Sequence, residues 1–313
     1  MRCRNKMLKH NIKNFIKDFY SNRSSIKKYF DLNQQKPTNI FSLNNGIGDC
    51  VILNHLLFDD ENSRSIYNIA CNSAHFAPIF EFNKFKNLNF FDHNNQAIRY
   101  ELLEFFDLGS GHIIQKSRRA LGLPIHLKPK SFLHTGLPKI KNKIGLHLST
   151  GNSALSLSNL NQNPRQIYEK NLLLIKDFIK KQSNQYEFVE FGQNSMGLEC
   201  KNFCGKNITE SIKELSTCEY FIGLNSGFMN IAACFDIKSI IIVNIPTNAN
   251  EIVLPSLKDI PCPDLNWLYP QNVHLHQDNE SPIVPIFNLN NLQKALNGEI
   301  YPFWSNEYLE LIK

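Results

Sequence analysis

The sequence predicts an α/β protein built from two doubly wound sheets that face each other across one central cleft. Short apolar runs rich in β-branched residues alternate with helical patterns, and this alternation is typical of parallel strands buried on both faces. A glycine-containing turn directly follows one strand in each half of the chain, and 313 residues suit two domains. Because such sheets bind ligands at the carboxyl ends of their strands, we expect the functional site in the cleft.

The N-terminal segment, residues 1–34, is predicted as a basic amphipathic helix. Its first 30 residues hold nine Lys or Arg and one acid, whereas the whole chain carries a net charge of +6. This helix could lie on an anionic membrane surface, or it could cover a domain with its lysines in water. The apolar face of the helix consists of Ile12, Phe15, Ile16, Phe19 and Tyr20. Because the remaining charge is not basic, we expect no nucleic-acid partner.

The first domain is predicted over residues 35–138. A short strand at 40–43 leads into the turn of NNGIGDCVIL, residues 44–53, which continues as a helix to about residue 58. Further strands are expected at 66–71 and 87–91, and a helical region at 100–125 ends with Gly122 and Pro124. Residues 127–143, rich in Lys and Pro, are interpreted as a linker, with the domain boundary near residue 138.

The second domain is predicted over residues 139–313 and includes a C-terminal tail. Four strands are expected, at 143–148, 187–192, 220–223 and 239–244. Three helices lie between them, marked by apolar faces at Tyr168 to Ile179, Ile208 to Leu215 and Phe228 to Phe235. The alternation in VHLH, 273–276, predicts a strand whose two histidines, His274 and His276, lie on an exposed face.

Two turns are candidate functional sites. Asp49 in the first turn either caps the following helix or projects a reactive carboxylate, and the turn alone allows both interpretations. Ser226 and Gly227 precede a helix whose free N–H groups could hold a phosphate, although Asn225 or Ser226 could equally be an ordinary N-cap. The first turn, NNGIGD, contains only the first two glycines of the dinucleotide-binding motif G-x-G-x-x-G, and no P-loop sequence is present in the chain. A dinucleotide-binding dehydrogenase and a P-loop NTPase are therefore poorly supported.

Four segments, taken in order, resemble glycosyltransferase family 9, the ADP-heptose:lipopolysaccharide heptosyltransferases. They are NNGIGDCVIL, KIGLHLST (143–150), FCGKNITESIKELSTCEYFIGLNSG (203–227) and the FMNIAACF that follows. The resemblance implies a GT-B-like architecture of two Rossmann-like domains, with the acceptor on the first and the nucleotide sugar on the second. It also implies inverting sugar transfer without a metal.

Particular residues take on roles through this resemblance. Asp49 matches the proposed general base, and Gly46 and Gly48 would let the substrates approach it. The donor site would be formed by Ser149, Thr150, Arg165, Asn225, Ser226, Gly227 and Asn230. Arg165 would neutralise charge on the departing diphosphate. The family usually has Asp at position 225 and His at position 230, so the two asparagines leave open a changed donor sugar or a loss of activity.

The expected function is therefore a metal-independent inverting glycosyltransferase. It would move a heptose-like sugar from a nucleotide-diphosphate donor, expected to be ADP-linked, to lipopolysaccharide core or a related surface glycan. No cofactor is expected beyond that donor substrate. A protein glycosyltransferase of the same fold and a non-catalytic nucleotide-sugar-binding protein are the alternatives. No apolar run approaches the roughly 20 residues that span a bilayer, so we expect a cytoplasmic protein, with peripheral contact at the inner face of the inner membrane.

Several other polar residues have simpler interpretations. His147 is predicted to pack in the core, and Glu190, at the end of a strand, is a candidate for contact with a ribose. The eight cysteines are interpreted as reduced thiols. Cys200 and Cys204 form a C-x3-C pair without the second pair that a structural zinc site needs.

Overall fold

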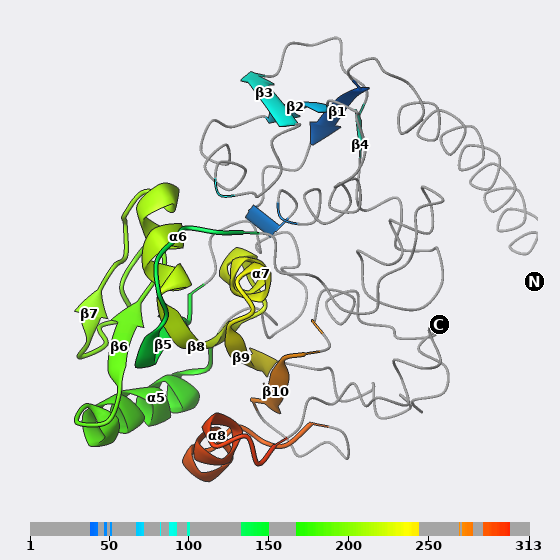
Figure 1. Ribbon diagram of the computed structural model, residues 1–313. Coiled ribbons are helices and arrows are strands. Elements are labelled where there is room, and N and C mark those ends of the chain that lie inside the picture. The colour runs from blue at the N-terminus through cyan, green and yellow to red at the C-terminus, as the bar shows by residue number, and fades with distance from the viewer. Residues whose placement is uncertain are drawn as a thin grey trace, which may run out of the picture.

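The computed structural model describes two parallel β-sheets, together with the helices that cover the larger sheet (Figure 1). The described residues are 38–42, 47–48, 51, 67–71, 82, 88–92, 99–100, 133–149, 167–243, 269, 271–277 and 284–300. The basic N-terminal helix and the helical region at 100–125 lie outside this part of the chain.

The smaller sheet belongs to the predicted first domain. Its strands are β1 (Thr38–Ser42), β2 (Tyr67–Cys71), β3 (Leu88–Asp92) and β4 (Arg99–Tyr100), in the order β3-β2-β1-β4. All neighbours pair in parallel, and β1 meets β4 through Phe41 opposite Arg99 and Ser42 opposite Tyr100. The first three strands confirm the sequence predictions to within two residues. The strand order reverses between β1 and β4, immediately beside the end of β1.

The larger sheet follows from residue 140 onward and is also wholly parallel. Its strands are β5 (Ile140–His147), β6 (Glu187–Glu190), β7 (Lys201–Asn202), β8 (Cys218–Leu224), β9 (Lys238–Val243) and β10 (Val273–His276). The order is β10-β9-β8-β5-β6-β7, so the direction of winding reverses between β5 and β8. The four strands predicted here are confirmed. The linker prediction is wrong for residues 140–143, because β5 already begins at Ile140.

Helices cover both faces of the larger sheet, as a doubly wound fold requires (Figure 1). On one face α5 (Glu169–Gln182) packs against α8 (Leu289–Leu296), and on the other α6 (Ile208–Ser216) packs against α7 (Gly227–Cys234). The three helices predicted between the strands are α5, α6 and α7. None of the helices in the described ranges is long and apolar enough to cross a membrane.

The core follows from the alternation of side chains along β5 and its neighbours. Ile144 and Leu146 are fully buried on the face that also receives Ile175 and Ile179 of α5. Gly145 lies between them on the opposite face, where a Cβ would stand 3.1 Å from Leu215 Cδ1 of α6. The strand is therefore buried on both sides, which explains its nearly continuous apolar sequence.

The histidines of β10 correct one prediction. The strand forms as predicted, but His274 and His276 are only 2% and 3% exposed, so the expectation of an exposed face is wrong. One cause is visible in the backbone: His276 N–H donates to Pro285, and Phe287 N–H donates back to His276. The segment returning toward α8 thus covers the outer side of this edge strand.

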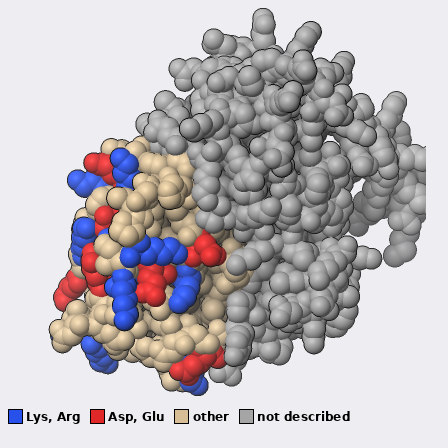
Figure 2. Space-filling model, in the orientation of Figure 1, with Lys and Arg blue, Asp and Glu red and all other residues tan. Residues whose placement is uncertain are grey.

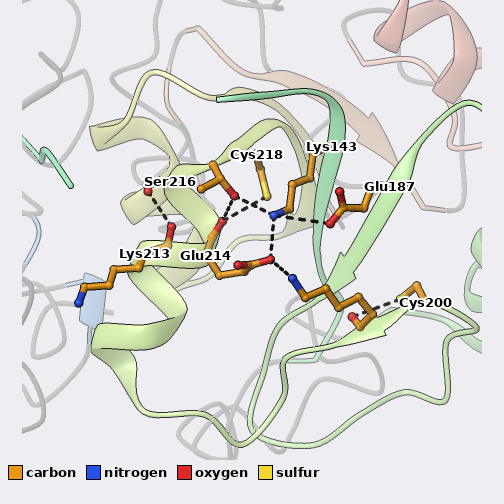
Figure 3. Close-up of polar contacts among 9 residues, drawn as sticks. Lys143, Glu187, Cys200, Lys213, Glu214, Ser216 and Cys218 are labelled. Atoms are coloured by element: carbon orange, nitrogen blue, oxygen red, sulfur yellow. Dashed lines mark hydrogen bonds and ion pairs between the residues drawn. The ribbon is translucent and has the colours of Figure 1, made fainter. Parts of the chain in front are cut away.

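A buried ion-pair network lies at the amino end of the same sheet (Figure 3). Lys143 Nζ is 2.8 Å from both Glu214 Oε1 and Thr217 Oγ1, and Lys201 Nζ donates to the same Glu214 oxygen at 2.6 Å. The Lys143 side chain is 2% exposed, and Glu187 Oε1 lies 3.6 Å from its Nζ. The network joins α6 to β5 and β7, at the end of the sheet opposite the ligand-binding edge.

Candidate functional site

The two candidate turns each lie at the point where the winding of a sheet reverses. The loop containing Gly46 to Asp49 leaves the carboxyl end of β1, beside the β1–β4 junction. Ser149 and the Asn225–Gly227 turn leave the carboxyl ends of β5 and β8, which are neighbours through His147 opposite Gly223. Ligands of open α/β sheets bind at these reversal points, where the loops diverge and leave a crevice. The strand order of the two sheets therefore points to the same two turns as the sequence motifs did.

These two turns contact each other. A Cβ added to Gly227 would lie 2.7 Å from Cβ of Ile47 and 3.5 Å from the backbone nitrogen of Gly48. Ile47, which is helical in the structure and stands two residues before Asp49 in the sequence, thus rests against the first residue of α7. Ile47, Gly48, Ser226 and Gly227 are all half-buried, so the junction retains some exposed surface.

Ser226 is the N-cap of α7, as one of the two interpretations of this turn predicted. Its Oγ accepts a long hydrogen bond, 3.4 Å, from Met229 N–H. Capping does not exclude phosphate binding, because a helix start carries more than one free N–H group and a partial positive charge. Asn225, directly before the cap, is 8% exposed.

Asn230 holds the first turn of α7 through both ends of its amide. Its Nδ2 donates to the carbonyl of Ser226 at 2.9 Å, while its Oδ1 accepts from the hydroxyl of Tyr269 at 2.7 Å. Asn230 is 2% exposed and Tyr269 is fully buried. An uncharged amide suits this place, because it both donates and accepts without burying a charge. The structure therefore assigns Asn230 a role in shaping the turn, and its role in donor binding stays a prediction.

Aromatic rings pack together where the carboxyl end of β5 meets the start of α7. His147 stacks on Phe228 with ring centroids 4.6 Å apart, and Phe191 lies 5.6 Å from Phe228 on another side. Burial lowers the pKa of His147 to about 4, so the imidazole is neutral at physiological pH. Its Nδ1 is buried and has no hydrogen-bond partner among the residues that the structure describes. The prediction of a packed core histidine is confirmed.

Gly192 allows the β6 end to approach Ser149. Its φ of +145° is one that side chains rarely adopt, and a Cβ there would lie 3.1 Å from Ser149 Oγ. Gly192 O also accepts from Gly205 N–H at 2.9 Å. A larger residue at 192 would therefore displace either this loop or Ser149.

Glu190 has a different role from the one suggested by its position. Its carboxylate is 1% exposed and accepts hydrogen bonds from Ser195 Oγ and from the N–H of Met196. Both oxygens are thus used to hold the loop after β6. The proposed ribose contact is not supported, because the carboxylate faces its own loop.

The described residues include six of the ten predicted site residues, and the structure brings most of these together. Gly48 lies beside Gly227, Ser226 and Asn230 share a hydrogen bond, and Ser149 lies two residues after the end of β5, the strand next to β8. Gly46, Asp49, Thr150 and Arg165 lie outside the described residues. Within the described ranges, no group of three or more His, Cys, Asp or Glu side chains is placed to hold a metal ion.

Three residues at the site were not predicted from the sequence. Ile47 was overlooked although it stands between the two glycines of NNGIGD, and that position is itself a signal of close approach. Gly192 is the last residue of the strand predicted at 187–192, and a glycine at a strand end is a second such signal. Tyr269 gave no local signal, because its partner Asn230 lies 39 residues earlier in the chain.

Charge on the visible face of the described region is mixed. Figure 2 shows Lys and Arg interspersed with Asp and Glu, without one sign dominating that face. One exposed ion pair of the described region is Lys181–Asp177 on α5, at 2.7 Å and one helical turn apart.

No model of a protein family matches the sequence, and no curated protein matches it. Solved structures do match in fold. Escherichia coli heptosyltransferase WaaC with ADP is 9% identical, with a TM-score of 0.56 over 84% of this chain and 99% of that one. The glycosyl transferase family 9 protein from Veillonella parvula DSM 2008 is 10% identical, with a TM-score of 0.54 over 84% and 96%.

A third similar structure is described as a dodecameric iron-containing heptosyltransferase, TibC, in complex with ADP-D-β-D-heptose. It is 13% identical, with a TM-score of 0.51, and the alignment covers 78% of this chain but only 63% of TibC. At these identities the likeness concerns the fold. It confirms the predicted GT-B-like fold and, at that level, the resemblance to glycosyltransferase family 9.

Proposed function

We propose that this protein is an inverting glycosyltransferase that uses a nucleotide-diphosphate sugar as donor. The observation that carries the proposal is the contact of Ile47 and Gly48 with Gly227, which joins the reversal points of two parallel sheets. A reaction between two substrates, one held on each sheet, needs such a junction. Similar folds with ADP and with ADP-heptose bound support a nucleotide sugar as the donor.

The chemistry follows from the residues assigned to the two turns. Asp49, as a carboxylate, would accept the proton of an acceptor hydroxyl while that oxygen attacks the anomeric carbon of the donor sugar. The bond from that carbon to the diphosphate oxygen breaks, and its electron pair leaves with the diphosphate. Attack from the face opposite the leaving group inverts the anomeric centre.

The departing diphosphate must be stabilised by the second sheet. The N–H groups at the start of α7, near Ser226 and Gly227, and the loop of Ser149 and Thr150 would hold it. Arg165 would add a charge-assisted, bidentate contact. These groups supply the positive potential that a metal supplies in other transferases, so we propose that transfer is metal-independent.

The proposed donor sugar and the proposed acceptor are taken from two solved structures of similar fold. Heptose is the proposed sugar and ADP its carrier, because ADP-D-β-D-heptose occupies a structure of the same fold. Lipopolysaccharide core or a related surface glycan is the proposed acceptor, since another similar structure is an E. coli ADP-heptose lipopolysaccharide heptosyltransferase. Glycosyltransferase family 9 usually carries ionisable residues at the positions of Asn225 and Asn230. If this protein uses a different donor sugar, these two asparagines would be the residues that select it.

Donor panels and one variant test the proposal. The wild-type protein is incubated with a series of nucleotide sugars and glycan acceptors while release of nucleoside diphosphate is followed. Asp49→Ala should lower turnover about 10²–10⁴-fold, as expected for loss of a general base. It should leave the rise in melting temperature caused by ADP unchanged, because binding of the nucleotide is assigned to the other sheet.

A matched variant controls for the loss of a carboxylate. Asp177→Ala removes an exposed Asp that pairs with its helical neighbour Lys181, and it should retain wild-type turnover. If Asp49→Ala transfers sugar at the wild-type rate, Asp49 is not the base. If ADP binds but no donor is ever consumed, the protein is a non-catalytic nucleotide-sugar-binding protein.

A further inference from the structure

We propose that Ile47 is a positioning residue that sets the distance between the acceptor-side loop and the donor-side turn. The inference rests on the proposed function and extends it to a residue that carries no chemistry itself. Ile47 lies two residues before Asp49, and its side chain sits against Gly227, the first residue of α7. Its contact would thereby fix how far the proposed base stands from the proposed diphosphate site.

The geometry of the contact leaves no room for a side chain at residue 227. A Cβ built there would lie 2.7 Å from Ile47 Cβ and 2.9 Å from Ile47 Cγ2. Cβ atoms are fixed to the backbone, so a change of rotamer at Ile47 cannot relieve the closer of these overlaps. Any side chain at 227 would therefore move one loop away from the other.

The chemical nature of Ile47 suits a spacer. A β-branched side chain has few accessible rotamers, so its bulk stays in one place. Its apolar surface also removes water from the junction without competing for phosphate or hydroxyl groups. Glycine at 227 completes the pair, because it allows the bulk of the isoleucine to touch the backbone of the helix start.

The rate of sugar transfer depends on how closely the two turns hold the reacting groups. Reacting atoms must be held close together, and displacement of about 1 Å can cost on the order of 10²-fold in rate. A methyl group at residue 227 would push the two turns apart by a distance of this order. The loss would appear in kcat, because each substrate would still bind to its own sheet.

A double-mutant cycle tests the contact, using Gly227→Ala with Ile47→Gly. Gly227→Ala should lower kcat about 10–100-fold in the wild-type background. In the Ile47→Gly background the same change should cost less than about 3-fold, because the nearest remaining atom, Gly48 N, is at an ordinary contact distance of 3.5 Å. Ile47→Gly alone should also reduce kcat, since the spacer is lost.

Two matched variants sharpen the cycle. Ile47→Ala keeps the Cβ that causes the closest overlap, so Gly227→Ala should remain impaired in that background. Ser226→Ala weakens the same helix start by removing the cap to Met229, but it adds no atom at the junction. Its effect on kcat should therefore be the same with Ile47 or Gly at position 47.

Melting temperatures of the same variants, measured without substrate, separate the possible failures. An equal loss of kcat from Gly227→Ala in every background overturns the inference. So does coupling in melting temperature without coupling in kcat, because the contact would then only stabilise the fold. If the wild-type protein turns over no nucleotide sugar, the proposed function fails and the positioning role fails with it, whereas an active enzyme with an uncoupled cycle refutes the positioning role alone.

Discussion

At the scale of single residues, His147 shows how burial controls protonation. Burial lowers the pKa of His147 from its ordinary value of 6.5 to about 4, so between those values the unfolded chain binds a proton that the folded protein excludes. The stabilising effect of the neutral imidazole is complete above about pH 6.5 and is lost as the pH falls toward 4. His274, with a pKa lowered by burial to about 3, acts in the same direction.

His147→Leu should therefore make stability less sensitive to acid. The slope of unfolding free energy against pH between 6 and 4 should become shallower by up to about 1.4 kcal/mol per pH unit, the value for one proton. Urea denaturation at several pH values measures it. An unchanged slope would mean that His147 protonates in the folded state as readily as in the unfolded chain.

Tyr269 provides a second residue-scale prediction. Tyr269→Phe removes the hydroxyl that donates to Asn230 and leaves the amide oxygen buried without that donor. The expected cost is about 1–3 kcal/mol of unfolding free energy. Because Asn230 also holds the carbonyl of Ser226, binding of ADP should weaken as well.

Tyr186→Phe is the control for that change. Tyr186 is also largely buried, at 8% exposure, but no hydrogen bond from its hydroxyl is found in the described region. Removal of the Tyr186 hydroxyl should change the free energy of unfolding by less than about 0.5 kcal/mol. Equal effects of the two substitutions would show that the bond between Tyr269 and Asn230 contributes nothing.

At the scale of elements, the network around Glu214 attaches α6 to the sheet. Burial alone would raise the pKa of Glu214. The hydrogen bonds and charges of Lys143 and Lys201 together outweigh that effect, so the pKa of Glu214 in the folded protein lies below its ordinary value of 4.5. The ionised carboxylate thus stabilises the fold above about pH 4.5. This contribution is lost as the pH falls through the lower, folded pKa.

Glu214→Gln should cost about 1–3 kcal/mol at pH 7, because Lys143 stays buried while its closest acid is removed. The difference between variant and wild type should shrink as the pH falls through the lowered pKa of Glu214, where the wild-type carboxyl also becomes neutral. Asp177→Asn, in an exposed pair, should change stability by less than about 0.5 kcal/mol at either pH. Chemical denaturation at pH 7 and pH 3.5 makes the comparison.

Sequence patterns predicted most strands but missed the two shortest, and they also missed α8; for the strands the reason is physical. The runs in β5, β8 and β9 are buried on both faces, so nearly every residue is apolar and the pattern is visible. The strands β4 and β7 have two residues each, which is too few for any periodicity. The burial of β10 depends on a segment that returns to cover it, and the strand sequence does not encode that cover.

At the scale of the whole molecule, the sequence located both turns of the candidate site but not the contact between them. A glycine after a strand is a local signal, and so is a helix start with Asn-Ser-Gly. That Ile47 should lie on Gly227 depends on how two separately folded sheets dock, and no local spacing contains that information. The role of Tyr269 was inaccessible for the same reason.

The proposed peripheral contact with the inner membrane is also a property of the whole molecule. Residues 1–30 hold nine Lys or Arg and one acid, whereas the whole chain has a net charge of +6, and an anionic surface attracts each Lys or Arg by about 1 kcal/mol. The full chain should sediment with vesicles that contain anionic lipid, and a variant without residues 1–30 should not. Vesicles of zwitterionic lipid are the control, and identical sedimentation of the two proteins would contradict membrane recruitment by this segment.

The two borders of the larger sheet have a consequence for the behaviour of the protein at high concentration. One border is β7, two exposed residues that include Lys201, and the other is β10, whose His276 already pairs with the backbone of the 284–287 segment. Long unpaired strand borders recruit strands from other molecules and seed aggregates. Neither of these borders offers such a template, so we expect concentrated solutions to resist polymerisation through this sheet.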